Sequence, residues 1–262
     1  MQNFQHISMP ETELELAGFR FGEKGTHTSR TMMLVELTDL LAALPATATR
    51  ENYAEAIVED NVLGKQTAST RRLSNQRLGE LYGLSQSVPV FRVLRRLWDI
   101  DEQGRPLIAL LCALARDPLL RASAQAVLPM PVGGELTRSS MTTAIRAATG
   151  NRFNEAILDK VARNAGSSWS QSGHLQGRVR KIRQEVRPTP GPVAFALWLG
   201  SVNGFAGEDL LRTWWARVLD QSPVELLDLA LRAKQLGLIK ASAGGGVVEI
   251  DVSPLNSMRG LF

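Results

Sequence analysis

The segment from residue 68 to 82 carries side chains that can read and hold nucleic acid. With successive residues placed about 100° apart, arginine and amide side chains share one side of a helix there, and Leu73, Leu81 and Leu84 lie opposite. Asn and Gln can bond adenine edges in pairs, and Arg can bond guanine or phosphate. A solvated polar face is the alternative interpretation of this pattern. The first candidate DNA contacts are Lys65, Arg71, Arg72, Asn75 and Gln76.

A second predicted helix, over residues 154–170, is amphipathic in the same way. Its apolar side includes Leu158, Val161 and Trp169. Its other side contains basic residues, amides and hydroxyls but no acidic residue. Exposed helix faces usually mix charges, because opposite charges one turn apart stabilise each other. We therefore expect this face to contact a polyanion. Its candidate contacts are Lys160, Arg163, Asn164, Ser167 and Gln171.

An extended basic ribbon follows this helix. Residues 173–184 lack helical periodicity, and a wing of this composition could straddle a phosphate backbone beside the helix. A basic linker or a localisation-like tract is the alternative interpretation. The candidate contacts in the ribbon are Arg178, Arg180, Lys181 and Arg183.

The distribution of charge supports the central segment as the main contact. The whole chain has a formal net charge of only +4, from 30 Lys and Arg against 26 Asp and Glu. Between Lys160 and Arg187 there are seven basic residues and one acid, a local +6, so the rest of the chain carries −2. A basic stripe on a nearly neutral chain is typical of proteins that bind polyanions.

The chain offers little for catalysis or metal binding. Its single cysteine, Cys112, lies in an apolar run, and His6, His27 and His174 are too far apart in sequence for zinc-ligand spacing. The segment 99–104 resembles the start of a calcium loop, but its twelfth position is Leu110, where a bidentate glutamate is needed. Serines near His174 lack a nucleophile elbow and an obvious carboxylate partner. We expect no cofactor, no metal and no enzymatic activity.

No segment predicts a membrane partner. The N-terminus lacks an apolar leader, and the apolar run around Cys112 is shorter than the roughly 20 residues that span a bilayer. We therefore expect a cytoplasmic protein.

Capping residues and hydrophobic periodicity predict the elements that must hold these side chains. Thr28 or Ser29 should cap a helix carrying Met32 to Leu41, Thr67 should cap the helix to Tyr82, and Ser222 with Glu225 forms a capping box. Further helices are expected over residues 53–59, 90–98, 107–115, 119–128, 137–148, 193–202 and 208–219, with a glycine-turned hairpin over 238–252. This order predicts a mainly α fold: a multi-helix globular body with helix-turn-helix or winged-helix modules and small β-hairpin wings.

Proline- and glycine-rich stretches at 129–134 and 188–192 divide the chain. The predicted organisation is an N-terminal arm (1–28), a helical domain with a helix-turn-helix at about 53–82 (29–130), a central helix-turn-helix with a basic wing (135–187), a C-terminal winged-helix-like module (190–252) and a tail (253–262).

Three segments together resemble the BrxA family of bacteriophage-exclusion (BREX) defence proteins. They are Glu59–Lys65 with Thr67–Arg72, Ala115–Arg121, and Gly204–Leu211 leading into Trp214. The resemblance implies an all-helical, DNA-binding accessory of a phage-defence system with two helix-turn-helix elements, and other BREX proteins as partners. The first element would lie at 53–82, and the second at 137–171 or in the C-terminal module.

The sequence thus predicts non-catalytic, largely phosphate-driven binding of double-stranded DNA within a phage-defence system. The central module is the expected main contact and the helix at 68–82 the second. Two alternatives stay open. One is an RNA-binding, antitermination-like protein, and the other is a protein-interaction adaptor that docks a partner through Trp198, Trp214 and Trp215.

Overall fold

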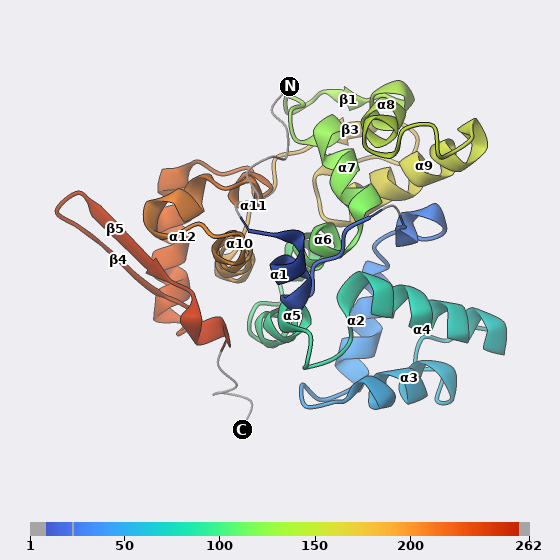
Figure 1. Ribbon diagram of the computed structural model, residues 1–262, viewed down its shortest axis with the longest axis horizontal. Coiled ribbons are helices and arrows are strands. Elements are labelled where there is room, and N and C mark those ends of the chain that lie inside the picture. The colour runs from blue at the N-terminus through green and yellow to red at the C-terminus, as the bar shows by residue number, and fades with distance from the viewer. Residues whose placement is uncertain (1–8, 23, 257–262) are drawn as a thin grey trace.

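Helices α5 (Pro89–Ile100) and α6 (Arg105–Arg116) lie at the centre of the fold (Figure 1). Residues 107–116 of α6 are all buried, and this helix contacts α4, α5, α7, α9 and α10. The structure, a computed structural model, describes residues 9–22 and 24–256. Within them helices predominate and the sheets have only two or three strands, which confirms the predicted mainly α class.

The first module consists of α2 (Leu34–Ala43), α3 (Arg50–Val58) and α4 (Ala68–Tyr82). The predicted bounds of α4 and its cap are confirmed, because the Thr67 hydroxyl accepts a hydrogen bond from the Thr70 amide. Thr49 caps α3 through a capping box that starts the helix three residues earlier than predicted. Residues 59–67 join α3 to α4, a longer connection than the roughly three to four residues of an ordinary helix-turn-helix.

The start predicted for α2 is wrong. Thr28 ends a short 3-10 helix, η1 (Thr26–Thr28), and the helix begins only after Met33, which has a left-handed φ of 54°. The reason is that the Met32 and Leu34 amides are hydrogen-bonded to side chains of α9 and not to a preceding helical turn. We call residues 25–34, which cross α9 in this way, the strap.

The residues of the predicted N-terminal arm that the structure describes pack against the rest of the fold. They include α1 (Glu11–Leu16), and Leu14, Phe19 and His27 are buried in or beside the core. The Arg20 amide donates to the Ala115 carbonyl of α6 at 3.1 Å. Residues 1–8 of that prediction, including His6, lie outside the described residues.

The central module runs through α7 (Pro118–Val127), β1 (Glu135–Leu136), α8 (Arg138–Thr149), α9 (Glu155–Gln171), β2 (Leu175–Gln176) and β3 (Lys181–Arg183). Its strands are antiparallel in the order β1-β3-β2, with Glu135 opposite Ile182 and Leu175 opposite Arg183. Helix, strand, helix, helix and a two-stranded wing is winged-helix order. The stretch predicted as a boundary, residues 129–134, lies between α7 and β1, and α7 packs on both α8 and α9.

The C-terminal module contains α10 (Pro190–Val202), η2 (Gly207–Arg212), α11 (Trp214–Arg217), α12 (Pro223–Gln235), β4 (Lys240–Gly244) and β5 (Val247–Asp251). The capping box at Ser222 and the hairpin are confirmed. The single helix predicted over 208–219 is instead two short helices, because Thr213 has an extended backbone and caps α11.

The tail begins with η3 (Ser253–Asn256), which is tied to α10 because the Trp198 indole N–H donates to Asn256 Oδ1 at 2.7 Å. Residues 257–262 lie outside the described part of the chain. Trp198 and Trp215 are buried and Trp214 packs against the core, so two of the three tryptophans considered for partner docking are inaccessible. Within the described residues, none of the helices combines the length and apolarity needed to cross a bilayer.

Candidate nucleic-acid interface

Helix α9 presents only its first half to solvent. Asn154 caps it by accepting a hydrogen bond from the Ile157 amide at 2.9 Å, and Lys160 and Arg163 are exposed on the following turns. Asp159 lies beside them and pairs with Arg163 and, at 2.6 Å, with Arg138 at the start of α8. The predicted contact face is therefore accessible in part, but the prediction that it lacks an acid is wrong.

The second half of α9 is covered by the strap. Asn164 Nδ2 donates to the His27 carbonyl at 2.8 Å, and Gln171 Nε2 donates to Thr31 at 3.1 Å. Ser167, between them, is half-buried. Asn164 and Gln171 thus hold the strap in place, which corrects their prediction as DNA contacts.

The wing turns at residues 177–180, between β2 and β3. Gly177 has a φ of +106°, and a Cβ atom there would come within 2.0 Å of the Arg180 carbonyl oxygen, so this turn requires glycine. Arg178 is exposed, and Val179 at the tip is 93% exposed. The Arg180 guanidinium, also exposed, donates to Glu135 of β1 at 2.6 and 2.9 Å.

The last two cations of the ribbon point inward. Lys181 is half-buried, donates to the Ser170 hydroxyl at 2.8 Å, and burial lowers the pKa of its ammonium group. The Arg183 side chain is only 3% exposed, pairs with Asp220 at 2.5 Å and donates to the Val127 carbonyl. The prediction of Arg183 as a DNA contact is therefore wrong, since its guanidinium joins the central sheet to the C-terminal module.

The residues predicted around α4 are also partly engaged. Lys65 pairs with Glu36 at 3.0 Å, Arg71 donates to the Glu59 carbonyl, and Asn75 accepts from Arg50. Two predicted contacts of this helix, Arg72 and Gln76, have exposed side chains, although Gln76 Nε2 also donates to Glu80 Oε1 at 3.0 Å.

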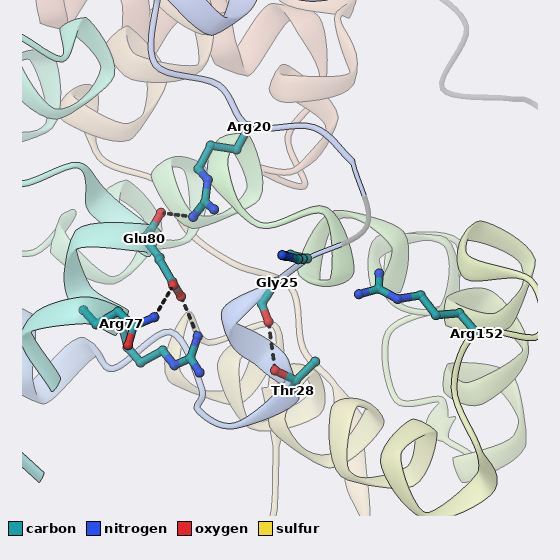
Figure 2. A pocket seen from close by; sticks show the side chains of 8 residues that line it. Arg20, Gly25, Thr28, Arg77, Glu80 and Arg152 are labelled. Carbon is teal, nitrogen blue, oxygen red and sulfur yellow. Dashed lines mark hydrogen bonds and ion pairs between the residues drawn. The ribbon is translucent and has the colours of Figure 1, made fainter. Parts of the chain in front are cut away.

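A cationic pocket lies between α4, the segment leading into the strap, and the turn between α8 and α9 (Figure 2). Its volume is about 340 Å³, and Arg20, Lys24, Arg77 and Arg152 line it together with Glu80. Sequence reasoning missed these four cations. They come from three segments far apart in the chain, and none belongs to a local basic run.

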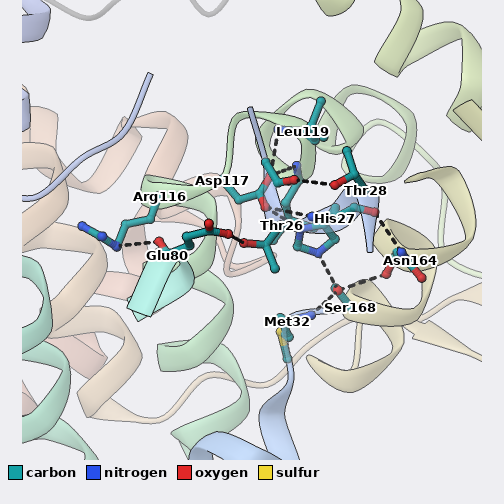
Figure 3. A network of polar contacts seen from close by, with 12 residues as sticks. Thr26, His27, Thr28, Met32, Glu80, Arg116, Asp117, Leu119, Asn164 and Ser168 are labelled. Atoms are coloured by element: carbon teal, nitrogen blue, oxygen red, sulfur yellow. Dashed lines mark hydrogen bonds and ion pairs between the residues drawn. The ribbon is translucent and has the colours of Figure 1, made fainter. Parts of the chain in front are cut away.

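A buried polar network ties the strap to α7 and α9 (Figure 3). His27 Nδ1 lies 2.8 Å from Asp117 Oδ2, and His27 Nε2 lies 2.8 Å from Ser168 Oγ. This is the order of a Ser-His-Asp triad, but all three residues are buried, and Ser168 Oγ also contacts the Met32 amide and the Asn164 carbonyl. A nucleophile must reach its substrate, so we interpret the network as structural.

His174 forms a second buried cluster. Its Nδ1 lies 2.8 Å from the Ser172 hydroxyl, and its Nε2 lies 2.7 Å from the Val218 carbonyl. Burial lowers the pKa of the imidazole to about 4, which outweighs the opposing effect of the Val218 carbonyl. The serine beside His174, considered above as a nucleophile, therefore serves this internal contact.

A loss of stability on mild acidification is expected from His174. The unfolded chain takes up a proton near pH 6.5 and the folded chain only near pH 4, so stability falls as the pH drops through that window. The full difference corresponds to about 3 kcal/mol. Urea unfolding at several pH values should show the loss in the wild type and a smaller loss in His174→Gln. Parallel pH profiles for the two proteins would contradict this.

No protein-family model matches the chain. A search of curated proteins also found no match. In the described part of the molecule, no three His, Cys, Asp or Glu side chains gather in a way that could hold a metal ion.

Proposed function

We propose that this protein binds double-stranded DNA through the exposed first half of α9 and the wing, without catalysing a reaction. The observation that carries the proposal is a row of three exposed arginines, each of which forms an ion pair. Arg180 of the wing pairs with Glu135 of β1. Arg138, which follows Glu135 by three residues, and Arg163 of α9 both pair with Asp159. The side chains of Arg180, Arg138 and Arg163 are 74%, 74% and 67% exposed.

This row suits a phosphate backbone. A guanidinium has more N–H donors than one carboxylate can accept, so each arginine can add a phosphate contact or exchange its carboxylate for one. Lys160 and Arg178 add further exposed cations. Helix-turn-helix proteins place the N-terminal residues of the recognition helix against the bases, and this is the half of α9 that the strap leaves open.

The role in phage defence rests on the resemblance of three sequence segments to the BrxA family. The protein would act there as a DNA-binding accessory, with other BREX proteins as partners. Arg72 and Gln76 of α4 supply a second, smaller contact.

The test is a mobility-shift titration of duplex DNA over a range of salt concentrations. Binding should weaken steeply with salt, and the double variant Arg178→Ala with Arg180→Ala should reduce the slope of log affinity against log salt by about 1.8, because each lost phosphate contact removes about 0.9.

The matched control removes two exposed cations from the C-terminal module, Arg232→Ala with Lys234→Ala, and should leave the slope unchanged. An unchanged slope in the wing variant would refute the wing contact. Absence of duplex binding by the wild type would refute the whole proposal, and preference for structured RNA in competition would favour the RNA-binding alternative.

A further inference from the structure

The tip of the wing carries an exposed apolar side chain between two cations. Val179 is 93% exposed, the largest fraction for any large apolar side chain in the described part of the chain. A single exposed valine needs no explanation by itself. Here, however, the neighbours Arg178 and Arg180 are also exposed, so an apolar group stands between two side chains suited to phosphate. A surface that matches this tip has phosphates on two sides and base edges between them.

The turn keeps the tip narrow. Gln176 lies opposite Ile182 in the sheet, and beyond this pair the chain turns within residues 177–181. A Cβ atom on Gly177 would lie 2.0 Å from the Arg180 carbonyl oxygen, so the backbone is tightly folded at this point, and Arg178 and Val179 are the two residues between them. Side chains at the end of such a turn can reach into the minor groove of B-DNA, which is about 6 Å wide.

The other proposed contacts place the tip next to the minor groove. In the proposed complex, the open half of α9 lies in the major groove, and the arginine row follows the phosphate backbone that borders it. The row runs from Arg163 of α9 through Arg138 to Arg180, and Val179 precedes Arg180 at the tip. The groove on the other side of that backbone is the minor groove. Arg180 then contacts the shared backbone, and the rest of the tip reaches across it.

We propose that the wing tip enters the minor groove and makes the protein prefer A·T base pairs, an inference that rests on the proposed binding of duplex DNA. Arg178 and Arg180 contact the two backbones that line the groove, and Val179 faces its floor between them. Guanine carries a 2-amino group that projects into this groove, whereas A·T pairs present only acceptor atoms there. The amino group stands in the way of Val179, and the valine offers no acceptor for it, so contact with a G·C pair is disfavoured.

Groove width favours the same base pairs. Runs of A·T pairs have a narrow minor groove with a strongly negative potential, which attracts arginine. Arg178 and Arg180 are close together in the chain, on either side of Val179, so a narrow groove lets both of them reach phosphate. The arginines alone would bind duplex of any sequence, because phosphate contacts carry no sequence information. The exposed valine between them therefore supplies the preference.

The test is a mobility-shift assay with the full chain and three duplexes of equal length, built of alternating A·T, alternating G·C and alternating I·C pairs. Inosine lacks the 2-amino group of guanine but leaves the major-groove edge of the base pair unchanged. The wild type should bind the A·T and I·C duplexes about 10-fold more tightly than the G·C duplex, an effect of the size of one unfavourable base pair.

The variant Val179→Ser tests the role of the valine, because a hydroxyl can accept a hydrogen bond from the amino group. It should remove most of the preference for A·T and I·C and leave the salt dependence of binding unchanged, since no charge is lost. The matched control is Val247→Ser, the same change at a 60% exposed position of the C-terminal hairpin, which should bind as the wild type does.

Equal binding of the three duplexes by the wild type, or grouping of the I·C duplex with the G·C duplex, would overturn the minor-groove contact. An unchanged preference in Val179→Ser would overturn it too, and would assign the exposed valine to another partner, such as a protein. Each of these results leaves the proposed DNA binding in place, because the duplexes are still bound. Absence of binding to all three duplexes would instead refute both proposals.

Discussion

Replacement of Asp117 with Ala should lower the free energy of unfolding by about 3–5 kcal/mol, because each of several buried N–H donors left without an acceptor costs about 1–3 kcal/mol. Asp117 Oδ1 caps α7 by accepting from the Leu119 and Leu120 amides at 2.9 and 3.1 Å, and Oδ2 accepts from the His27 amide and ring. Burial raises the pKa of this carboxyl, but His27 and the amide donors outweigh burial and keep it below its ordinary value. The variant would leave all these donors buried and unpaired.

Urea unfolding at neutral pH measures this loss. The matched control is Thr137→Ala, which removes the cap of α8 at an exposed site and should cost only about 1 kcal/mol. An equal loss in both variants would show that Asp117 is only a helix cap and that the network with His27 and Ser168 adds nothing.

The second large effect is expected for Arg183→Ala. This change leaves Asp220 without its buried partner and should also lower stability by about 3–5 kcal/mol. The salt dependence of DNA binding should stay as in the wild type, because Arg183 is not at the surface.

Unfolding and mobility-shift measurements on one preparation distinguish a structural role of Arg183 from a role in DNA contact. Arg187→Ala is the control, an exposed arginine four residues further along the chain, whose loss should change stability by no more than about 0.5 kcal/mol. A stable Arg183→Ala protein with a reduced salt slope would restore Arg183 as a DNA contact and contradict the structural role.

Local sequence signals located most of the helices. Thr67 and Ser222 are predicted as caps because their hydroxyl oxygens can accept from an amide three residues ahead, and the structure contains both bonds. The same reasoning failed at Thr28, where an equally suitable residue ends a 3-10 turn. There the partners of the backbone, Ser168 and Gln171, lie more than 130 residues away, beyond any local pattern.

The sequence predicted which types of residue form the candidate site better than it predicted which individual residues lie at the surface. Of the basic ribbon, Arg178 and Arg180 remain at the surface, but nothing in the sequence distinguished them from Arg183, whose orientation depends on the pairing of β3 with β2. The short strand β1, which completes the sheet, has only two residues and leaves no alternating pattern to detect. The sequence did not predict the four cations of the pocket either, because only the fold brings them together.

The burial of α6 sets a limit on how this protein can change. The helix supplies core contacts to α4, α7, α9 and α10 at once, so the modules share one interior. A fragment carrying only residues 118–187 would expose the apolar faces of α7 and α9 that rest on it. The exposed side chains of the wing and of the turn before α9 can therefore change one at a time, whereas exchange of a whole module with another protein would require a matching central helix.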